Sequence, residues 1–367
     1  MKILYVTTIS NTINAFLIPH INMLTNLGHQ VDIACNIVQP IKEELLDRKC
    51  GVFNLEFQRS PLKKENLLAY KKLKNLVQTN DYDIVHTHTP IASFITRLAC
   101  KDIKEIKVFY TAHGFHFYKG AKLINWLVYY PIEKWLSRYT DTLITINKED
   151  YDRAKKSKFK TNKTILMNGV GINLDKFTPQ TQEKKFALRK EYGYKKDDFI
   201  LIYVGELNAN KNQNLIIEVA DKLKNKIPNL KLLLVGTGIL EEHYKSEVKN
   251  LNLQNQVEFL GYRNDVNKLM ALSDISVSAS KREGLPVNIM EAMATGLPVI
   301  VTDCRGNRDL VEHECNGYVI DEIKEVIEAI EKLNTSKSLR EQFANNSLKL
   351  VQKYKIEKIL KELEKLY

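Results

Sequence analysis

The sequence has no long hydrophobic run, and no stretch approaches the roughly 20 consecutive apolar residues that a membrane-spanning helix requires. The first residues, MKILYVTTIS, are too short and too strand-like to predict a signal peptide. Low-complexity tracts and segments rich in proline and glycine are also absent, which argues against a disordered chain. The 367 residues, of which 44% are hydrophobic, therefore predict a soluble globular protein large enough for two domains.

Cysteine is scarce and scattered along the chain. The five cysteines are odd in number and include no Cys-x-x-Cys pair. They are Cys35, Cys50, Cys100, Cys304 and Cys315. This pattern argues against a disulfide framework and a cysteine-based zinc cluster, and it predicts reduced thiols in a cytoplasmic protein.

Acidic residues are under-represented in the first half of the chain only. Residues 1–170 contain 25 Lys and Arg against 15 Asp and Glu, a net charge of +10. Residues 171–367 contain 30 against 29, a net charge of +1. A basic face of this kind indicates a polyanionic partner such as phospholipid headgroups, nucleic acid or a phosphorylated substrate.

Apolar runs typical of β-strands alternate with helical patterns along the whole chain, which predicts two doubly wound α/β domains with parallel sheets. The expected strands are residues 2–8, 30–36, 83–88, 107–112, 141–146 and 163–168 in the first half, and 199–205, 230–236, 256–261, 274–280 and 297–303 in the second. A polar, loop-rich stretch marks the boundary between the halves. We therefore expect a first domain over 1–170, a second over 171–350, and a C-terminal helix over 351–367 that could return to the first domain.

The segment EGLPVNIME, residues 283–291, offers an anion site between two carboxylates. Pro286 suits the first turn of a helix, and the unpaired N–H groups of residues 285–288 would face the sheet edge where doubly wound sheets bind ligands. Glu283 precedes these donors, and Glu291 leans back toward them. A ligand that combines phosphates with sugar hydroxyls would use the whole element. Two glutamates eight residues apart also occur often by chance, so only their placement distinguishes them.

Two other strand exits carry candidate phosphate-binding residues. Lys211 stands beside an expected helix N-terminus, after the strand that ends at Gly205, and such a lysine suits a phosphate. Taken alone, it is more simply a solvated loop lysine, because the stretch is not a Walker loop. Gly236 and Gly238 follow the next strand, a weak signal because any tight turn of this type favours glycine.

Histidines gather after two expected strands of the first domain. His86 and His88 lie at the end of one strand, and His113 and His116 follow the other. A metal cluster is conceivable, but no carboxylate or cysteine accompanies them, so metal binding is the weaker interpretation. His113 lies between a strand end and a glycine and is the better candidate for a ligand contact, whereas His86 and His88 could simply be packed.

These motifs resemble those of the retaining glycosyltransferases of family 4, above all the bacterial branch that builds capsule and exopolysaccharide repeat units. The strongest match is EGLPVNIMEAMATGLPVI, with Glu283 and Glu291 as the Glu-x7-Glu motif. Further matches follow in family order over nearly the whole chain, among them FLIPHINMLTNLGHQVDIAC, DIVHTHTP, TAHGFHFYKG, GELNANKNQ and VEFLGYRNDV. The resemblance implies the GT-B fold, in which two Rossmann-like domains face each other across an interdomain cleft.

The resemblance also implies roles for the candidate residues. Glu283 and His113 would be catalytic, Glu283 against the hydroxyls of the donor sugar and His113 near the reacting centre, while Glu291 would hold the ribose. Lys211 would bind the diphosphate with backbone N–H groups of residues 285–287, and the backbone around Tyr262 and Arg263 would meet the uracil. The full set of implied substrate-binding residues is Gly205, Lys211, Gly236, Tyr262, Arg263, Leu285, Pro286, Val287 and Glu291. No bound metal and no cofactor are expected.

Two features depart from the family pattern. Most members carry arginine where this chain has Glu206, so the diphosphate site lacks one cation, which Arg263 or Arg305 could replace. The first loop, TTISNTINAF, is not glycine-rich as in most members, so the acceptor-side loop could differ in shape.

The implied reaction moves a sugar from a UDP-sugar to a hydroxyl with the anomeric configuration retained, and the expected sugar is an N-acetylated hexosamine or deoxyhexosamine. In the front-face mechanism favoured for such enzymes, the leaving phosphate takes the acceptor proton. The protein then contributes positioning and charge stabilisation. The sequence leaves the linkage and the oligomeric state open.

The basic first domain suggests an acceptor held at a membrane. PLKKENLLAYKKLKNLVQ and YKGAKLINWLVYYPIEKWLSRY combine lysines with large apolar residues at helical spacing, which is typical of interfacial helices. About half of their aromatic residues are expected in the core instead; the four are Trp126, Tyr129, Tyr130 and Trp135. We expect a peripheral protein on the cytoplasmic face of an anionic membrane, with a polyprenyl-diphosphate-linked saccharide as acceptor.

Two other functions fit parts of the pattern. A UDP-sugar epimerase or hydrolase could use the same architecture, although the Glu-x7-Glu element together with TAHGFHFY favours transfer. A basic nucleic-acid-binding protein would use the charge of the first domain, but no nucleic-acid-binding motif appears, so nucleic acid is not an expected partner.

Overall fold

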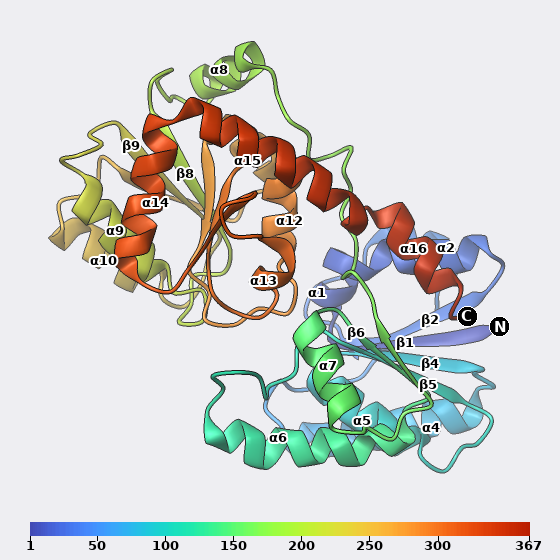
Figure 1. Cartoon of the computed structure of the whole chain (residues 1–367). Coiled ribbons are helices and arrows are strands. Elements are labelled where there is room, and N and C mark those ends of the chain that lie inside the picture. The colour runs from blue at the N-terminus through green and yellow to red at the C-terminus, as the bar shows by residue number, and fades with distance from the viewer. The chain divides into compact units, whose positions relative to one another are not determined.

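The computed structural model describes residues 1–367 and divides into two compact α/β units. One unit comprises Met1–Gly171 together with Ile356–Tyr367, and the other comprises Ile172–Lys355. Each contains one sheet (Figure 1), and every strand pair in the two sheets is parallel, which confirms the predicted fold class. None of the helices combines the length and apolar composition needed to cross a membrane.

The first unit is built on a seven-stranded sheet with the order β3-β2-β1-β4-β5-β6-β7. The strands are β1 (Lys2–Ile9), β2 (Gln30–Asn36), β3 (Val52–Asn54), β4 (Ile84–His88), β5 (Lys107–Ala112), β6 (Thr142–Thr145) and β7 (Lys163–Leu166). The α-helices are α1 (Ser10–Thr12), α2 (Ile18–Asn26), α3 (Glu43–Asp47), α4 (Glu65–Thr79), α5 (Pro90–Cys100), α6 (Leu123–Leu136), α7 (Lys148–Lys156) and α16 (Ile356–Glu364). Strand order reverses between β1 and β4, so ligands are expected at the carboxyl ends of these strands.

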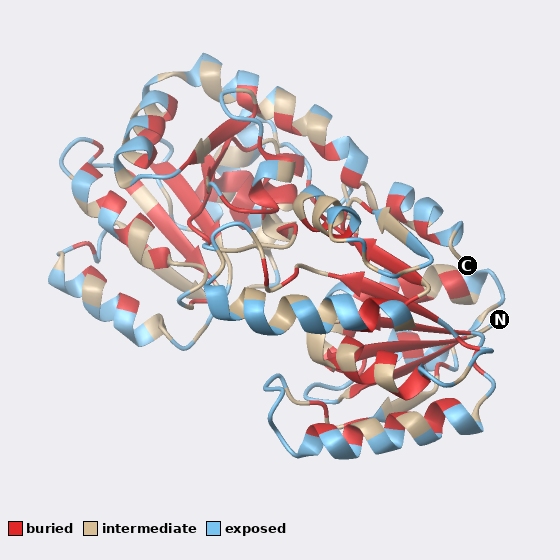
Figure 2. Cartoon of the chain, turned by 60° about the horizontal axis from the view of Figure 1, so that its bottom comes forward, coloured by how far each residue is buried: buried red, intermediate tan, exposed pale blue.

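Helices cover both faces of this sheet, and β1 shows why. Leu4 and Val6 pack in a core with α4 and α5, whereas Ile3 and Tyr5 pack in a second core with α2. This alternation follows from the two-residue period of a strand. Figure 2 shows the result, with buried strands covered by helices that are buried along one side only.

Helix α16 packs in the first unit although it is the last helix of the chain. It contacts α2, and its Ile359 and Leu363 are buried together with Met167. Beyond the helix, the hydroxyl of Tyr367 forms a 2.9 Å hydrogen bond with the hydroxyl of Tyr5 in the first strand.

The second unit is built on a six-stranded sheet with the order β10-β9-β8-β11-β12-β13. The strands are β8 (Phe199–Val204), β9 (Leu230–Val235), β10 (Val257–Gly261), β11 (Ile275–Ser278), β12 (Val299–Thr302) and β13 (Gly317–Ile320). The α-helices are α8 (Gln182–Glu191), α9 (Gln213–Leu223), α10 (Glu241–Asn250), α11 (Val266–Leu272), α12 (Val287–Ala294), α13 (Asn307–Leu310), α14 (Ile323–Thr335) and α15 (Lys337–Leu350). Here strand order reverses between β8 and β11.

Every strand expected from the sequence is present, with ends that differ by a residue or two. The sequence pattern does not predict β3 and β13. Both lie at a sheet edge and have only three and four residues, which is too short for a periodic signal. All five cysteines are free thiols, as expected.

Candidate functional site

Two loops meet at the switch point of the second sheet, one after β8 and one after β11. Asn210 joins them: its backbone carbonyl accepts from the Lys281 N–H at 2.8 Å, and its side-chain amide donates to the Arg282 carbonyl at 3.0 Å. Because these bonds link neighbouring loops, the two segments are held at one place on the sheet edge where doubly wound folds bind ligands.

Tyr203, near the end of β8, adds a second link between the same loops. Its buried hydroxyl donates to the Lys211 carbonyl and accepts from the Ala279 N–H at 3.2 Å. It therefore fixes the backbone that carries Lys211.

Lys211 and Glu283 face each other across the two loops. The Lys211 Nζ lies 2.6 Å from Glu283 Oε1, and their side chains are 19% and 12% exposed. The Lys211 side chain passes over Gly205, where an added Cβ would lie 3.5 Å from it. The simpler interpretation of Lys211 as a solvated loop lysine is therefore wrong. An ammonium has three donors, so the bond to Glu283 leaves donors for an anion.

The loop after β9 packs tightly against the loop that carries Lys211. Gly236 has φ +137°, and an added Cβ would lie 2.2 Å from the Gly205 carbonyl oxygen. At Gly238 an added Cβ would lie 2.3 Å from the Leu207 carbonyl oxygen. The weak Gly-x-Gly signal thus marks a place where two backbones meet without room for a side chain.

This close approach makes Gly236→Ala a sensitive probe of the site. Backbone strain of this kind costs about 1–3 kcal/mol, which in a unit of this size lowers Tm by roughly 2–4 °C per kcal/mol. Gly193→Ala is the matched control, because Gly193 also has a positive φ but nothing within 4 Å of an added Cβ. We expect Gly236→Ala to lower Tm more than Gly193→Ala in differential scanning calorimetry. Equal shifts would contradict the packing argument.

Helix α12 presents its N-terminus at the same edge. It begins at Val287, one residue later than expected: Pro286 is its N-cap, with φ −72° and ψ 116°, and no side chain caps the first turn. Asn288 anchors the helix by donating to the Val204 carbonyl at the end of β8 at 2.8 Å. The first-turn N–H groups are therefore available donors beside Lys211 and Glu283.

Glu291 lies one turn into α12, and its carboxyl group makes no hydrogen bond. Burial raises the pKa of Glu291 to about 7, an effect that the charge of Lys176 partly opposes. Hydrogen bonds from hydroxyl groups of a ligand would stabilise the ionised form of this carboxyl group.

Two arginines differ in their contact with the loops that carry Lys211 and Glu283. Arg305 is almost fully buried, and its Nε donates to the backbone carbonyl of Glu283 at 3.0 Å. Arg263 instead pairs with Asp265 at 2.5 Å. Glu206 is exposed and supplies no cation. Of the two arginines, Arg305 is therefore the better placed to supply the positive charge that is missing at position 206.

The other nucleotide-site candidates differ in exposure. Tyr262, just after β10, is 78% exposed, whereas Leu285 and Pro286 are buried and Val287 is half-buried. Leu285 and Pro286 therefore contribute backbone rather than side chain to the edge of the sheet.

The switch point of the first sheet carries stacked histidines. The rings of His86 and His88 are 4.3 Å apart, and His88 Nδ1 lies 3.1 Å from His113 Nε2. His86 bonds to the hydroxyl of Tyr367 and, at 2.8 Å, to that of Thr111. The interpretation of His86 and His88 as packed residues is confirmed, since both are fully buried.

Burial keeps these imidazoles neutral. It lowers the pKa of His113 to about 4 and holds the pKa values of His86 and His88 well below 6.5. Part of the His113 side chain remains exposed, so its neutral ring can donate or accept a hydrogen bond with a ligand. No three side chains of His, Cys, Asp or Glu come together in an arrangement that would hold a metal ion.

Sequence reasoning missed the residues that position the site. Tyr203, Asn210 and Tyr367 act through hydrogen bonds between segments far apart in sequence. Nothing in their local patterns marks them, because a tyrosine in a buried strand or at a chain end is ordinary.

Comparison with known proteins identifies the family. Residues 2–147 match the model for glycosyl transferase 4-like domains, and residues 184–350 match that for glycosyl transferases group 1. EpsD of Bacillus subtilis (strain 168), a protein assigned as a glycosyltransferase, is 43% identical over 321 residues, which cover 87% of this chain and 83% of EpsD. The chain is a glycosyltransferase. The resemblance inferred from its motifs is confirmed.

Two further comparisons describe the glycosyltransferase more closely. The Escherichia coli UDP-Gal:alpha-D-GlcNAc-diphosphoundecaprenol alpha-1,3-galactosyltransferase is 29% identical over 350 residues, or 94% of this chain and 90% of the relative. The crystal structure of HepE from Anabaena in complex with UDP and glucose superposes with a TM-score of 0.82 over 100% of this chain and 99% of HepE, at 20% identity. This likeness supports the GT-B fold of the glycosyltransferase.

Proposed function

We propose that this glycosyltransferase moves a sugar from a UDP-sugar to a saccharide carried by a polyprenyl diphosphate, with retention of anomeric configuration, in capsule or exopolysaccharide synthesis. The observation that carries the proposal is the Lys211–Glu283 pair beside the uncapped N-terminus of α12. The E. coli relative is named for UDP-galactose and a diphosphoundecaprenol-linked acceptor, and HepE was crystallised with UDP, which supports these substrate classes.

Each residue has a place in the proposed reaction. Lys211 and the α12 N–H groups hold the diphosphate, Glu291 accepts from the ribose hydroxyls, and Glu283 accepts from hydroxyls of the transferred sugar. The bond from the anomeric carbon to the β-phosphate oxygen breaks while a bond to the acceptor oxygen forms on the same face. The acceptor proton passes to the leaving phosphate. The protein stabilises the growing phosphate charge with Lys211, backbone donors and Arg305, so we propose no metal.

The test is transfer itself. The protein is incubated with UDP-galactose, UDP-N-acetylglucosamine and UDP-N-acetylgalactosamine, with and without N-acetylglucosaminyl-diphospho-undecaprenol. We expect UDP release only with acceptor, faster for an N-acetylated donor, and an α-linked product by NMR. Rapid conversion of the donor without acceptor would instead favour an epimerase or hydrolase.

We also propose peripheral attachment to an anionic membrane. On α6, Leu123 and Leu127 are 72% and 65% exposed, and Trp135 is 40% exposed. The other aromatic residues of this helix, Trp126, Tyr129 and Tyr130, pack against a core cluster instead. Exposed apolar side chains among lysines are typical of an interfacial helix. Flotation with vesicles of anionic lipid, but not of neutral lipid, is the expected result.

The raised pKa of Glu291 predicts a pH dependence of UDP binding. Ribose hydroxyls bind the ionised carboxylate best, so lowering the pH below 7 protonates Glu291 and weakens UDP binding. For a pKa of about 7, the ionised fraction of Glu291 at pH 5.5 is about one thirtieth. The affinity for UDP should therefore fall by at most about thirtyfold at that pH. We expect Glu291→Gln to remove this dependence. Calorimetry measures the affinity for UDP of wild type and of Glu291→Gln at each pH. The ratio of the two affinities cancels the protonation of UDP itself. A ratio that does not change with pH would contradict the assignment.

A further inference from the structure

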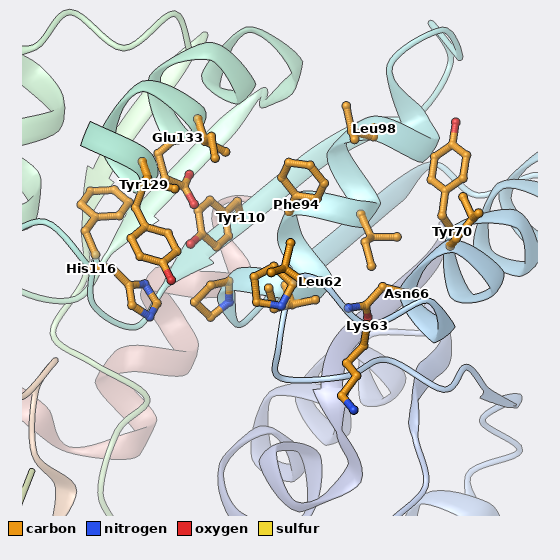
Figure 3. Close-up of a pocket in the computed structure, with 18 of the residues that line it drawn as sticks. Leu62, Lys63, Asn66, Tyr70, Phe94, Leu98, Tyr110, His116, Tyr129 and Glu133 are labelled. Atoms are coloured by element: carbon orange, nitrogen blue, oxygen red, sulfur yellow. The ribbon is translucent and has the colours of Figure 1, made fainter. Parts of the chain in front are cut away.

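A large apolar cavity opens in the first unit between α4, α5 and α6 (Figure 3). Its volume is about 610 Å³, which is within the range of pockets that enclose small ligands. Most of its wall is apolar or aromatic and includes Leu62, Phe94, Leu98, Tyr110, Tyr129 and Ile132. A cavity of this composition favours a hydrocarbon over a polar ligand.

The floor of the cavity is one face of α5. Ile91, Phe94 and Leu98 stand at helical spacing along this face, and they are only half-buried although α5 is otherwise a core helix. From Pro90 to Leu98 the helix rises by roughly 12 Å, so the cavity is elongated along a straight wall. This shape suits a short stretch of chain rather than a compact ring.

Three polar side chains of the wall have partners within the protein. Glu133 pairs with Arg97 at 2.8 Å, and Asn66 donates to the Ser60 carbonyl at 2.9 Å. The ring of His116 stacks on that of Tyr129 at 4.7 Å. Because these groups contact partners within the protein and the rest of the wall is mostly apolar, the interior recognises its occupant mainly through apolar contact.

The residues at the edge of the cavity indicate what kind of headgroup the occupant carries. Gly114 and His116 line the cavity and follow His113 closely in the chain, so the cavity reaches the segment beside His113. Lys63 is exposed on the same wall, and its ammonium makes no bond and extends away from the apolar side chains (Figure 3). A molecule with its hydrocarbon inside would therefore place an anionic headgroup at Lys63.

We propose that the cavity holds the isoprene units nearest the diphosphate of the lipid-linked acceptor, with Lys63 bound to that diphosphate. The proposal rests on the proposed function for the identity of the acceptor. The occupant is the acceptor rather than a bilayer lipid, because only the acceptor must bring its headgroup to the edge of the sheet where His113 lies.

Photocrosslinking of the full chain tests the cavity without relying on activity. A farnesyl diphosphate analogue with a diazirine on its terminal isoprene is expected to label peptides of α4, α5 and α6, and unlabelled farnesyl diphosphate should compete. Phosphatidylglycerol with a diazirine on its acyl chain should not label these peptides. Labelling by phosphatidylglycerol that farnesyl diphosphate does not displace would assign the cavity to a bilayer lipid and overturn the proposal.

Variants locate the contact. Leu98→Trp fills the cavity from its floor and should lower labelling by about tenfold or more. Leu46→Trp is the control, since Leu46 is an exposed leucine on α3 outside the cavity. Lys63→Met should weaken competition by farnesyl diphosphate but not by farnesol. Equal labelling of wild type and a correctly folded Leu98→Trp would overturn the proposal. Labelling by wild type without sugar transfer would leave the cavity assigned and refute the proposed function alone.

Discussion

Replacing Lys211 with methionine is expected to lower kcat/KM for the UDP-sugar by about 10²–10³-fold, the usual loss when one pre-positioned stabiliser of charge leaves an active site. The methionine keeps much of the apolar stem that passes over Gly205 but removes the ammonium. Most of the loss should appear in kcat, because charge on the β-phosphate grows as the sugar leaves. Steady-state kinetics with varied UDP-sugar measures both terms.

The matched control for this variant is Lys281→Met. Lys281 is exposed on the neighbouring loop and makes no ion pair, although its backbone bonds to Asn210. Its loss should leave kcat/KM within about twofold, since surface charge changes have small effects. Equal losses of kcat/KM in the two variants would show that Lys211 contributes only to the overall positive charge of the site and does not contact the diphosphate directly.

The Lys211 variant also has a consequence for stability. Removal of the ammonium leaves the largely buried Glu283 carboxylate without its partner, so Tm should fall. The double variant Lys211→Met with Glu283→Gln should regain part of that stability while activity stays low. Recovery of activity in the double variant would contradict a direct role for Lys211.

Glu283→Gln is expected to lower kcat by about 10²-fold while UDP binding stays the same or tightens. The amide can still bond to sugar hydroxyls but accepts more weakly than a carboxylate. At the same time Lys211 loses the anion that now lies 2.6 Å away and becomes more available to the diphosphate. Calorimetric titration with UDP, beside the kinetics, separates these two effects.

Glu291→Gln provides the comparison for this second variant. It changes the other carboxylate of the same element and is expected to weaken UDP itself, because Glu291 is assigned to the ribose. The opposite pattern, with UDP binding lost in Glu283→Gln and retained in Glu291→Gln, would reverse the two assignments.

Much of the fold could be predicted because its signals are local. Each buried parallel strand has a continuous apolar run, and the order of strands and helices restricts the topology. The candidate residues of the second unit follow from the same logic, since Lys211 and Glu283 come directly after strands that flank a switch point. The sequence could not show that the two side chains pair, because that depends on Asn210 and Tyr203 linking the loops.

The remaining features of the structure depend on packing between distant segments. Tyr367 reaches the histidines of β4 only because α16 returns to the first unit. The apolar cavity arises where α4, α5 and α6 leave a space, which the sequence pattern of a single helix does not show. The onset of α12 at Val287 rather than Pro286 is a smaller case, set by the extended conformation of the proline.

The most direct test of the central claim is a thermal-shift comparison of UDP and GDP on wild type, Glu283→Ala and Glu291→Ala. At a concentration of 100 Kd, a ligand of the native state adds about 2.7 kcal/mol of stability. UDP should therefore raise the Tm of wild type by roughly 5–10 °C and GDP by much less. The shift by UDP should persist in Glu283→Ala and largely vanish in Glu291→Ala. If UDP shifts none of the three proteins, the assignment of a UDP-sugar site to this element is wrong.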